Sequence, residues 1–365
     1  MERDLYLVLE NGEVFRGKRF GAEGEAAGEV VFHTGMVGYL ETLTDPGYCG
    51  QIVVQTFPLI GNYGLIPDEQ IGDRAYLKAY IVREWCQSPS NYRSEGTVDA
   101  FLKQQGVVGL YDIDTRKLTR ILRENGTMKG ALAESPERAH EVLTAFIKED
   151  KATEGHASKV ELVTRREVLT VPAKGETRFR VAVMDYGCTR NLVRMLTERG
   201  MEVTLFPAGT AALDVLVTDP DGIILSNGPF DPEEDAELIF EAQRLVYSGK
   251  PLMGVDFGHL LLALARGARM TKLKHGHRGA NQPVKHLPSD RVYIASHAQG
   301  YAVDADFLPM NAWATFENLN DKTVEGLQYT DIPAFSVQFI PEDGRGKSTT
   351  GFLFDQFEKF MKDAQ

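Results

Sequence analysis

Residues 254–258, Gly-Val-Asp-Phe-Gly, constrain the fold of this chain more than any other segment. They follow an apolar run and precede a second one at 260–265, which predicts a strand, a sharp turn and a helix. Small residues two places before and two places after Asp256 are what such a turn requires. We therefore expect Asp256 to stand above the carboxyl end of a buried strand, with the N–H groups of a helix start beside it.

The same alternation of strand and helix runs through the whole part of the chain that follows residue 179. Strands are predicted at 181–184, 202–206, 222–226 and 252–255, and helices at 191–199, 234–248 and 259–266. Repeated strand–helix units predict a doubly wound, mostly parallel sheet. In such sheets a site forms at the carboxyl ends of the strands, where the loops 185–187, 227–230 and 256–258 lie.

The first part of the chain has a β-rich pattern instead. Short strands are predicted at 5–9, 14–15, 29–32 and 51–55, with a hairpin turn at 10–12, and helices at 114–123 and 134–148. We expect a β-rich domain over residues 1–150 and an α/β domain over residues 179–365. Residues 151–178 are charged, include Pro172 and Gly175 and have little periodicity, so they are predicted to be a linker.

Charge and composition exclude several classes of protein. The formal net charge is −12 without a basic block, which argues against nucleic acid or an anionic membrane as a partner. No apolar run approaches the roughly 18–20 residues that cross a bilayer, and the N-terminal residues match a strand rather than a signal peptide. Cys49, Cys86 and Cys188 are odd in number and widely spaced, which argues against disulfides and a thiolate metal site. We expect a cytoplasmic protein.

Motifs in both parts resemble the small, glutaminase-type subunit of carbamoyl-phosphate synthetase. The agreement runs in order through residues 28–32, 44–46, 112–120, 190–191, 225–229, 254–258, 261–265 and 333–338. The second part is similar to class I glutamine amidotransferases in general, and the first part ties the chain to this subunit. The resemblance implies a β-rich N-terminal domain joined to an amidotransferase-like α/β domain.

The resemblance also implies a Cys-His-Glu triad that hydrolyses glutamine and passes ammonia through a tunnel to a large, ATP-using subunit. In this chain the cysteine position holds Asp256 and the histidine position holds Ile340, so only Glu342 matches. No histidine follows His297, and a small shift of the alignment therefore does not restore the triad. We expect no functional catalytic residue in the glutaminase site.

The residues at the glutamine pocket also differ from those that the resemblance implies. Leu260 stands where the resemblance implies a glutamine whose side-chain amide contacts the substrate. Phe230 stands in place of a glycine that allows close approach of the backbone, and Gly47 stands in place of a serine that contacts the substrate. A Gln-Asn-His-Gly-Phe motif reads His-Ala-Gln-Gly-Tyr at residues 297–301. The altered pocket positions are Gly47, Gly228, Phe230, Phe257, Leu260, Ala298, Gly300 and Tyr301. These changes predict that glutamine binding is lost.

Two other roles for Asp256 stay open. A carboxylate at the first turn of a helix accepts hydrogen bonds from free N–H groups, which is a purely structural role. An aspartate on an elbow is also the nucleophile of hydrolases that displace esters or halides, for which a base would come from His259, His275, His277 or His297. The pair His275 and His277 has no third ligand at a matched spacing, so we expect a structural loop and no metal site.

The leading hypothesis is therefore a small subunit that lacks glutamine hydrolysis and acts as a structural or regulatory partner of an ammonia-using large subunit. The resemblance implies a hetero-oligomer that serves pyrimidine and arginine biosynthesis. No cofactor is expected in this chain, since ATP and Mg belong to the large subunit. The alternatives are a pseudo-amidotransferase that binds or regulates a partner outside the synthetase, and the Asp256 hydrolase.

Overall fold

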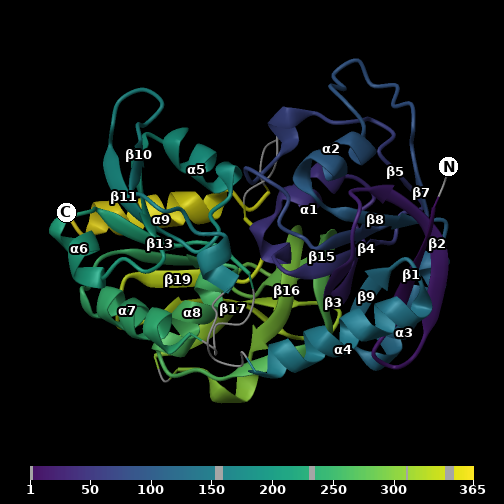
Figure 1. Ribbon diagram of the computed structural model, residues 1–365. Helices are drawn as coiled ribbons and strands as arrows, with labels where there is room; N and C mark the ends of the chain where they lie inside the picture. The colour runs from purple at the N-terminus through teal and green to yellow at the C-terminus, as the bar shows by residue number, and fades with distance from the viewer. Residues whose placement is uncertain (1–2, 153–158, 230–234, 310, 342–348) are drawn as a thin grey trace. The chain divides into compact units, whose positions relative to one another are not determined.

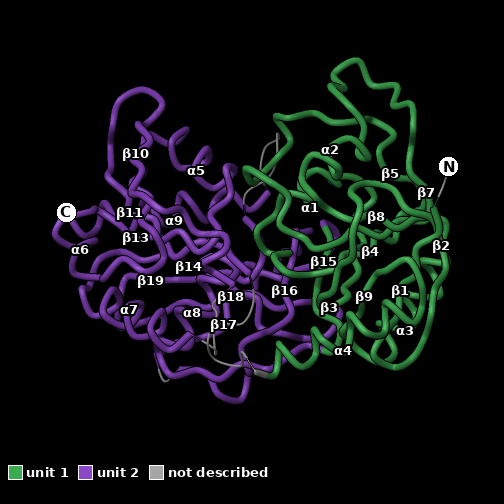
Figure 2. Tube along the Cα trace, viewed as in Figure 1, with its two compact units in different colours: residues 1–157, 274–279 green, residues 158–273, 280–365 purple. Residues whose placement is uncertain are grey.

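A computed structural model describes residues 3–152, 159–229, 235–309, 311–341 and 349–365. It divides into two compact units, one of Met1–Ala157 with Lys274–Gly279 and the other of Ser158–Leu273 with Ala280–Gln365 (Figure 2). The segment Lys274–Gly279 is the middle of strand β15 (Met270–His286), and its grouping with the first unit was not predicted. The sequence pattern does not predict the unit to which this segment belongs, because the grouping arises from contacts between residues far apart in the chain.

The first unit contains a closed barrel of seven strands in the order β1-β2-β8-β6-β4-β3-β9. The strands are β1 (Asp4–Leu9), β2 (Val14–Gly21), β3 (Ala26–His33), β4 (Gln51–Gln55), β6 (Ala79–Ile81), β8 (Val108–Tyr111) and β9 (Met128–Ala133). The predicted β-rich domain is thus a barrel, which closes where β1 pairs with β9. A separate ribbon joins β5 (Leu59–Ile60) to β7 (Glu84–Trp85).

Among the described residues of the first unit, four α-helices accompany the barrel: α1 (Tyr39–Thr44), α2 (Val98–Gln105), α3 (Thr115–Asn125) and α4 (Pro136–Ala152). The structure confirms both helices that we predicted in this part of the chain. Helix α3 begins after Asp114, whose carboxylate accepts a hydrogen bond from the backbone N–H of Lys117 at 2.8 Å. It ends at Gly126, where a φ of 97° suits glycine.

The second unit is built on a ten-stranded sheet in the order β10-β12-β11-β13-β14-β19-β18-β16-β15-β17. Its strands are β10 (Leu169–Val171), β11 (Phe179–Asp185), β12 (Met201–Pro207), β13 (Gly222–Leu225), β14 (Leu252–Val255), β15, β16 (Arg291–Val303), β17 (Ala312–Asn318), β18 (Val324–Tyr329) and β19 (Ala334–Val337). The four predicted strands are present as β11 to β14. They pair in parallel with one another, and β14 pairs in parallel with β19.

Helices cover both faces of this sheet (Figure 1). Helices α6 (Ala212–Val217), α7 (Ala236–Tyr247) and α8 (Phe257–Ala265) pack on one face, and α5 (Arg190–Thr197) and α9 (Phe352–Asp363) on the other. Alternate residues of β11 divide between the two cores, with Ala182 and Met184 in the first and Val181 and Val183 in the second. No helix within the described ranges has the length and apolar character needed to cross a membrane.

Two expectations about this unit need correction. Residues 151–178 are not only a linker, because they contain the 3-10 helix Lys159–Leu162 and strand β10, which pairs antiparallel with β12. Strand β10 has three residues and is largely exposed, so it has no apolar period for a sequence pattern to detect. Strands β15 to β19 were also missed. The burial of β15 does not alternate, so its sequence lacks the period-two signal of a strand.

Candidate functional site

Asp256 lies on a sharp turn between β14 and α8, as the sequence predicts. Its backbone has a φ of 55° and a ψ of −109°, a conformation that residues other than glycine rarely adopt. The backbone N–H of Asp256 donates to the carbonyl oxygen of Val337 on β19 at 2.9 Å, which ties the turn to the neighbouring strand. Backbone strain of this kind is held in place by the surrounding structure and is common at functional sites. The geometry of a nucleophile elbow is therefore present.

The two glycines that flank the turn are required by close backbone approach. A Cβ atom at position 258 would lie 2.0 Å from the carbonyl oxygen of Leu225, and one at position 254 would lie 2.6 Å from the carbonyl oxygen of Gly258. Gly258 also donates its N–H to the carbonyl oxygen of Ser226 at 3.0 Å. Only residues without a side chain fit these positions, which confirms the reason we gave for the spacing.

The expected capping role of Asp256 is not observed. Asp256 is the N-cap residue of α8, but its side chain makes no capping hydrogen bond. Capping side chains extend from a backbone in the β region, and the positive φ of Asp256 directs its carboxylate differently. The side-chain amide of Gln338 instead approaches Asp256, 3.5 Å from Oδ1 and 3.4 Å from the backbone oxygen. Asp256 is buried, with 2% of its surface exposed.

His259, in the first turn of α8, is hydrogen-bonded to a serine rather than to an acid. Its Nδ1 shares a hydrogen bond of 2.8 Å with the hydroxyl of Ser336 on β19. Its Nε2 has no hydrogen-bond partner among the described residues. Burial lowers the pKa of His259 to about 4, although Glu325 acts to raise it. The imidazole is therefore neutral at physiological pH and is oriented by Ser336 rather than by an acid.

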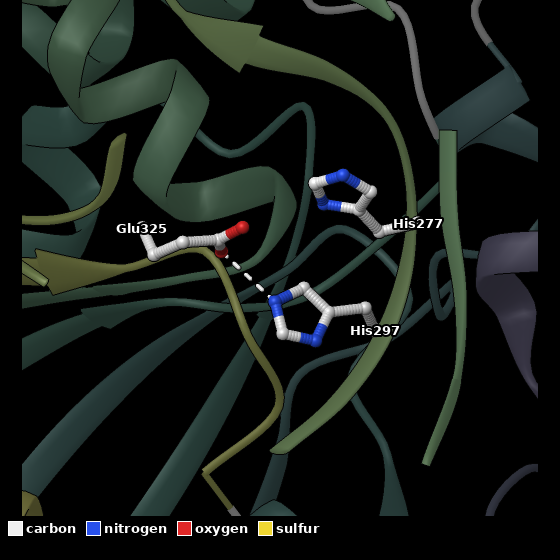
Figure 3. A group of neighbouring side chains, drawn as sticks. All are labelled: His277, His297 and Glu325. Carbon is white, nitrogen blue, oxygen red and sulfur yellow. Dashed lines mark hydrogen bonds and ion pairs between the residues drawn. The ribbon is translucent and has the colours of Figure 1, made fainter. Parts of the chain in front are cut away.

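A second histidine, His297 on β16, is paired with an acid. Its Nε2 lies 2.9 Å from Oε2 of Glu325 on β18, and both side chains are fully buried (Figure 3). The other oxygen of Glu325 accepts hydrogen bonds from the amide of Asn318 at 3.2 Å and the hydroxyl of Thr323 at 3.3 Å. These contacts fix the carboxylate and orient the imidazole, as the acid of a catalytic His–acid pair does.

Main-chain pairing links this histidine–glutamate pair to the elbow. Gln338, which contacts Asp256, donates its backbone N–H to the carbonyl oxygen of Glu325 at 2.9 Å. Residues that face each other across an antiparallel pair project to the same side of a sheet. Asp256, Gln338, Glu325 and His297 therefore belong to one buried polar cluster of the second unit. Glu325 was not predicted to be a site residue. Strand β18 was not predicted, and a single acidic residue does not by itself indicate a site.

The predicted pocket positions in the second unit are mostly packed side chains. Phe257 and Leu260 are buried in the core, and the ring of Phe257 lies 5.3 Å from that of Tyr186. Ala298 is buried, and Gly300 lies beside it on β16. Tyr301 is half-buried against the same core as Phe257. Apolar packing thus occupies positions where the resemblance implies substrate contacts.

Glycine is required at Gly228, because a Cβ atom there would lie 2.3 Å from the carbonyl oxygen of Tyr186. Ile340 is half-buried, and its backbone N–H donates to the carbonyl oxygen of Ser296 at 2.9 Å. Phe230 and Glu342 lie outside the described residues. The structure therefore places a hydrocarbon side chain at the position where the resemblance implies the histidine of the triad.

Three other predicted residues belong to the first unit. Gly47 lies in the 3-10 helix Pro46–Tyr48, and its N–H donates to the carboxylate of Asp45 at 2.8 Å. Burial raises the pKa of Asp45 to about 6, while the hydrogen bond from Gly47 lowers it. His275 packs on Phe32, with ring centroids 5.6 Å apart. His275 is half-buried, whereas His277 on the same segment, Lys274–Gly279, is buried.

The parallel sheet and the strained turn at the end of β14 define an α/β domain of the class that carries an active-site residue on an elbow. In this chain it follows a β-barrel domain. Comparison with known families gives the same two parts. The model described as carbamoyl-phosphate synthase small chain, CPSase domain, matches residues 7–132, and that described as glutamine amidotransferase class-I matches residues 182–360.

Similar proteins extend over almost the whole chain. The carbamoyl phosphate synthase small chain of Clostridium perfringens is 44% identical over 357 residues, which is 97% of this chain and 98% of that one. The small chain of Listeria monocytogenes is 43% identical over 356 residues, covering 97% and 96%. The pyrimidine-specific small chain of Halalkalibacterium halodurans is 43% identical over 357 residues, covering 98% and 96%. The chain belongs to the family of carbamoyl-phosphate synthase small chains.

Proposed function

We propose that this chain is a carbamoyl-phosphate synthase small chain that does not hydrolyse glutamine and instead supports a large chain that uses free ammonia. The observation that carries the proposal is the elbow, which keeps its strained geometry but presents the carboxylate of Asp256. Ile340 stands where the resemblance implies the histidine. The site therefore has the shape of a glutaminase without the nucleophile or the proton carrier.

The chemistry of the two groups supports this reading. A thiolate attacks an amide readily and leaves again when water attacks the thioester. A carboxylate at the same place would form an anhydride, an intermediate of much higher energy. Its negative charge would also stand beside the developing oxyanion, which needs hydrogen-bond donors and positive potential. The alkyl side chain of Ile340 has no proton to give to departing ammonia, and general acid–base help is worth about 10²–10⁴-fold in rate.

The relatives are small chains by name, so the partner proposed for this chain is a carbamoyl-phosphate synthase large chain in a hetero-oligomer. ATP and Mg would bind to that partner, and this chain would hold no cofactor. One of the relatives is named as pyrimidine-specific, which favours pyrimidine biosynthesis as the pathway. The near-complete coverage of both chains supports a role that needs the barrel unit as well as the amidotransferase-like unit.

The test uses the full chain, purified alone and with the large chain of its own genome. We expect no glutamate or ammonia from glutamine in either preparation, and carbamoyl phosphate from ammonium, bicarbonate and ATP in the complex. A gel-filtration experiment should show that the two chains elute together. Carbamoyl phosphate formed equally well from glutamine would refute the loss of hydrolysis. Failure of the two chains to associate would refute the role as a partner.

A second candidate function is favoured by the buried pair of His297 and Glu325. An aspartate nucleophile and a histidine oriented by an acid are the parts of a hydrolase that displaces halide from carbon. Asp256 would attack the carbon and release halide, and the histidine would then activate water to cleave the alkyl ester. Halide release from short haloalkanes that is lost in Asp256→Ala and His297→Gln would support this candidate. Absence of any halide release would dismiss it.

A further inference from the structure

The first unit carries a hollow of about 710 Å³ that the proposed function does not use. Its lining includes four arginines, of which Arg83 follows β6 and Arg116, Arg120 and Arg123 belong to α3. The hollow therefore includes part of the segment 112–120, which is one of the sequence motifs that resemble the family. A protein with a formal net charge of −12 concentrates positive charge here, and such a concentration attracts anions.

The three arginines of α3 form a row on one side of the helix. Arg116, Arg120 and Arg123 stand at positions i, i+4 and i+7, while Leu118 and Leu122 point into the barrel core. Like charges at this spacing repel each other and destabilise a helix. The row thus weakens the helix that bears it, and a bound anion would remove that repulsion.

Few acids neutralise this row. Arg120 is 3.9 Å from Glu124, and both side chains are exposed, so the pair contributes little. Arg116 and Arg123 form no ion pair with any of the described residues. Asp114 also lines the hollow, and its carboxylate is engaged by the backbone of α3.

Hydrogen bonds orient other parts of the lining. The guanidinium of Arg83 donates from Nη1 to the carbonyl oxygen of Ile113 at 3.0 Å, which leaves its remaining N–H groups for another acceptor. Two threonines of α3 add hydroxyl groups, and Thr119 donates to the carbonyl oxygen of Thr115 at 2.7 Å. The lining therefore combines forked, charged donors with small polar groups.

The geometry points to a binding site for the polyphosphate group of a nucleotide. Arginine forks match the oxygen atoms of phosphate in pairs, and several forks around one hollow match several adjacent phosphates. Four arginines and one aspartate give a charge complementary to two or three phosphates. A volume of about 710 Å³ lies within the roughly 300–1,000 Å³ of small-molecule sites, and an extended nucleic acid would need a longer basic surface.

The test is calorimetric titration of the full chain with ATP, with tripolyphosphate and with citrate, at low and moderate salt. We expect ATP and tripolyphosphate to bind, citrate to bind at least tenfold more weakly, and the affinity to fall with salt. The variant R116Q/R123Q should bind ATP at least tenfold more weakly. The control R166Q/R291Q removes two exposed arginines outside the hollow and should stay within twofold of the parent chain.

Thermal unfolding without ligand shows whether R116Q/R123Q folds, and we expect a midpoint equal to or above that of the parent chain because a repulsion is removed. Absence of binding by ATP, equal binding of citrate, or unchanged binding by R116Q/R123Q would overturn the proposal. If R116Q/R123Q still binds ATP but no longer associates with the large chain, the arginines contact an acidic surface of that chain instead. This result would also overturn the proposal. The titration needs neither glutamine nor the large chain, so its outcome is separate from that of the proposed function.

Discussion

Replacing Asp256 with glycine should stabilise the second unit. The backbone at this position has a φ of 55° and a ψ of −109°, which glycine adopts without steric cost. Holding another residue in such a conformation costs of order 1–3 kcal/mol. Active enzymes tolerate this cost because the strain presents their nucleophile. Here the proposed function gives the side chain of Asp256 no catalytic role, so the strain does not serve catalysis.

The expected gain follows from the difference between two effects. Relief of strain contributes about 1–3 kcal/mol, and the greater freedom of glycine in the unfolded chain removes about 0.4–1 kcal/mol. Loss of the long contact between Gln338 and Oδ1 of Asp256, at 3.5 Å, subtracts little. The free energy of unfolding should therefore rise by about 1 kcal/mol, which corresponds to about 2–4 °C in the unfolding midpoint of a domain of this size.

The assay is urea and thermal unfolding of the parent chain, Asp256→Gly and Asp256→Ala. Alanine removes the carboxylate but keeps a Cβ atom, and it therefore retains the strain. We expect the glycine variant to be the most stable of the three and the alanine variant to be close to the parent chain. A glycine variant no more stable than the alanine variant would show that the turn is not strained in the way described.

Three other predictions concern the same unit. Glu325→Ala removes the acceptor of His297 in a fully buried pair and should lower the free energy of unfolding by about 1–3 kcal/mol, where an unchanged free energy would contradict the pairing. Gly258→Ala places a methyl group 2.0 Å from the backbone oxygen of Leu225, so we expect it to cost about 3 kcal/mol or more, or to yield an unfolded chain, with normal urea unfolding as the contrary result. Burial lowers the pKa of His259 from 6.5 to about 4. Between these pH values the unfolded chain binds a proton at this residue and the folded chain does not. The stability present above pH 6.5 is therefore lost as the pH falls toward 4. Between pH 6.5 and pH 5 this residue should account for about 1.5 kcal/mol, which His259→Asn should abolish in urea unfolding at the two pH values.

Local patterns were sufficient for several elements. Helix α3 follows from its capping Asp114 and its terminal Gly126, and its two ends lie within two residues of the predicted bounds 114–123. The parallel strands β11 to β14 follow from short apolar runs separated by helical segments. These features depend on residues close together in the chain, so their physical causes are visible in the sequence.

Other elements depend on contacts between distant residues. Closure of the barrel requires β1 to meet β9, more than a hundred residues later, and no local pattern specifies that pairing. The buried pair of His297 and Glu325 likewise arises from the way β16 and β18 are placed in the sheet. The arginine row of α3 can be read from its spacing, but the hollow that it lines includes Arg83 from another part of the barrel unit.

The amino-acid sequence by itself determined helix α3, the strands β11 to β14, the elbow and the residue at its centre, because these follow from side-chain type and spacing. Only the tertiary structure decided that Asp256 is strained and does not cap its helix, and that an oriented histidine lies in the same buried cluster. The physical reason is that backbone strain, burial and side-chain hydrogen bonding are imposed by neighbours from other strands. Such neighbours are set by the packing of the whole unit and leave no mark in a local pattern.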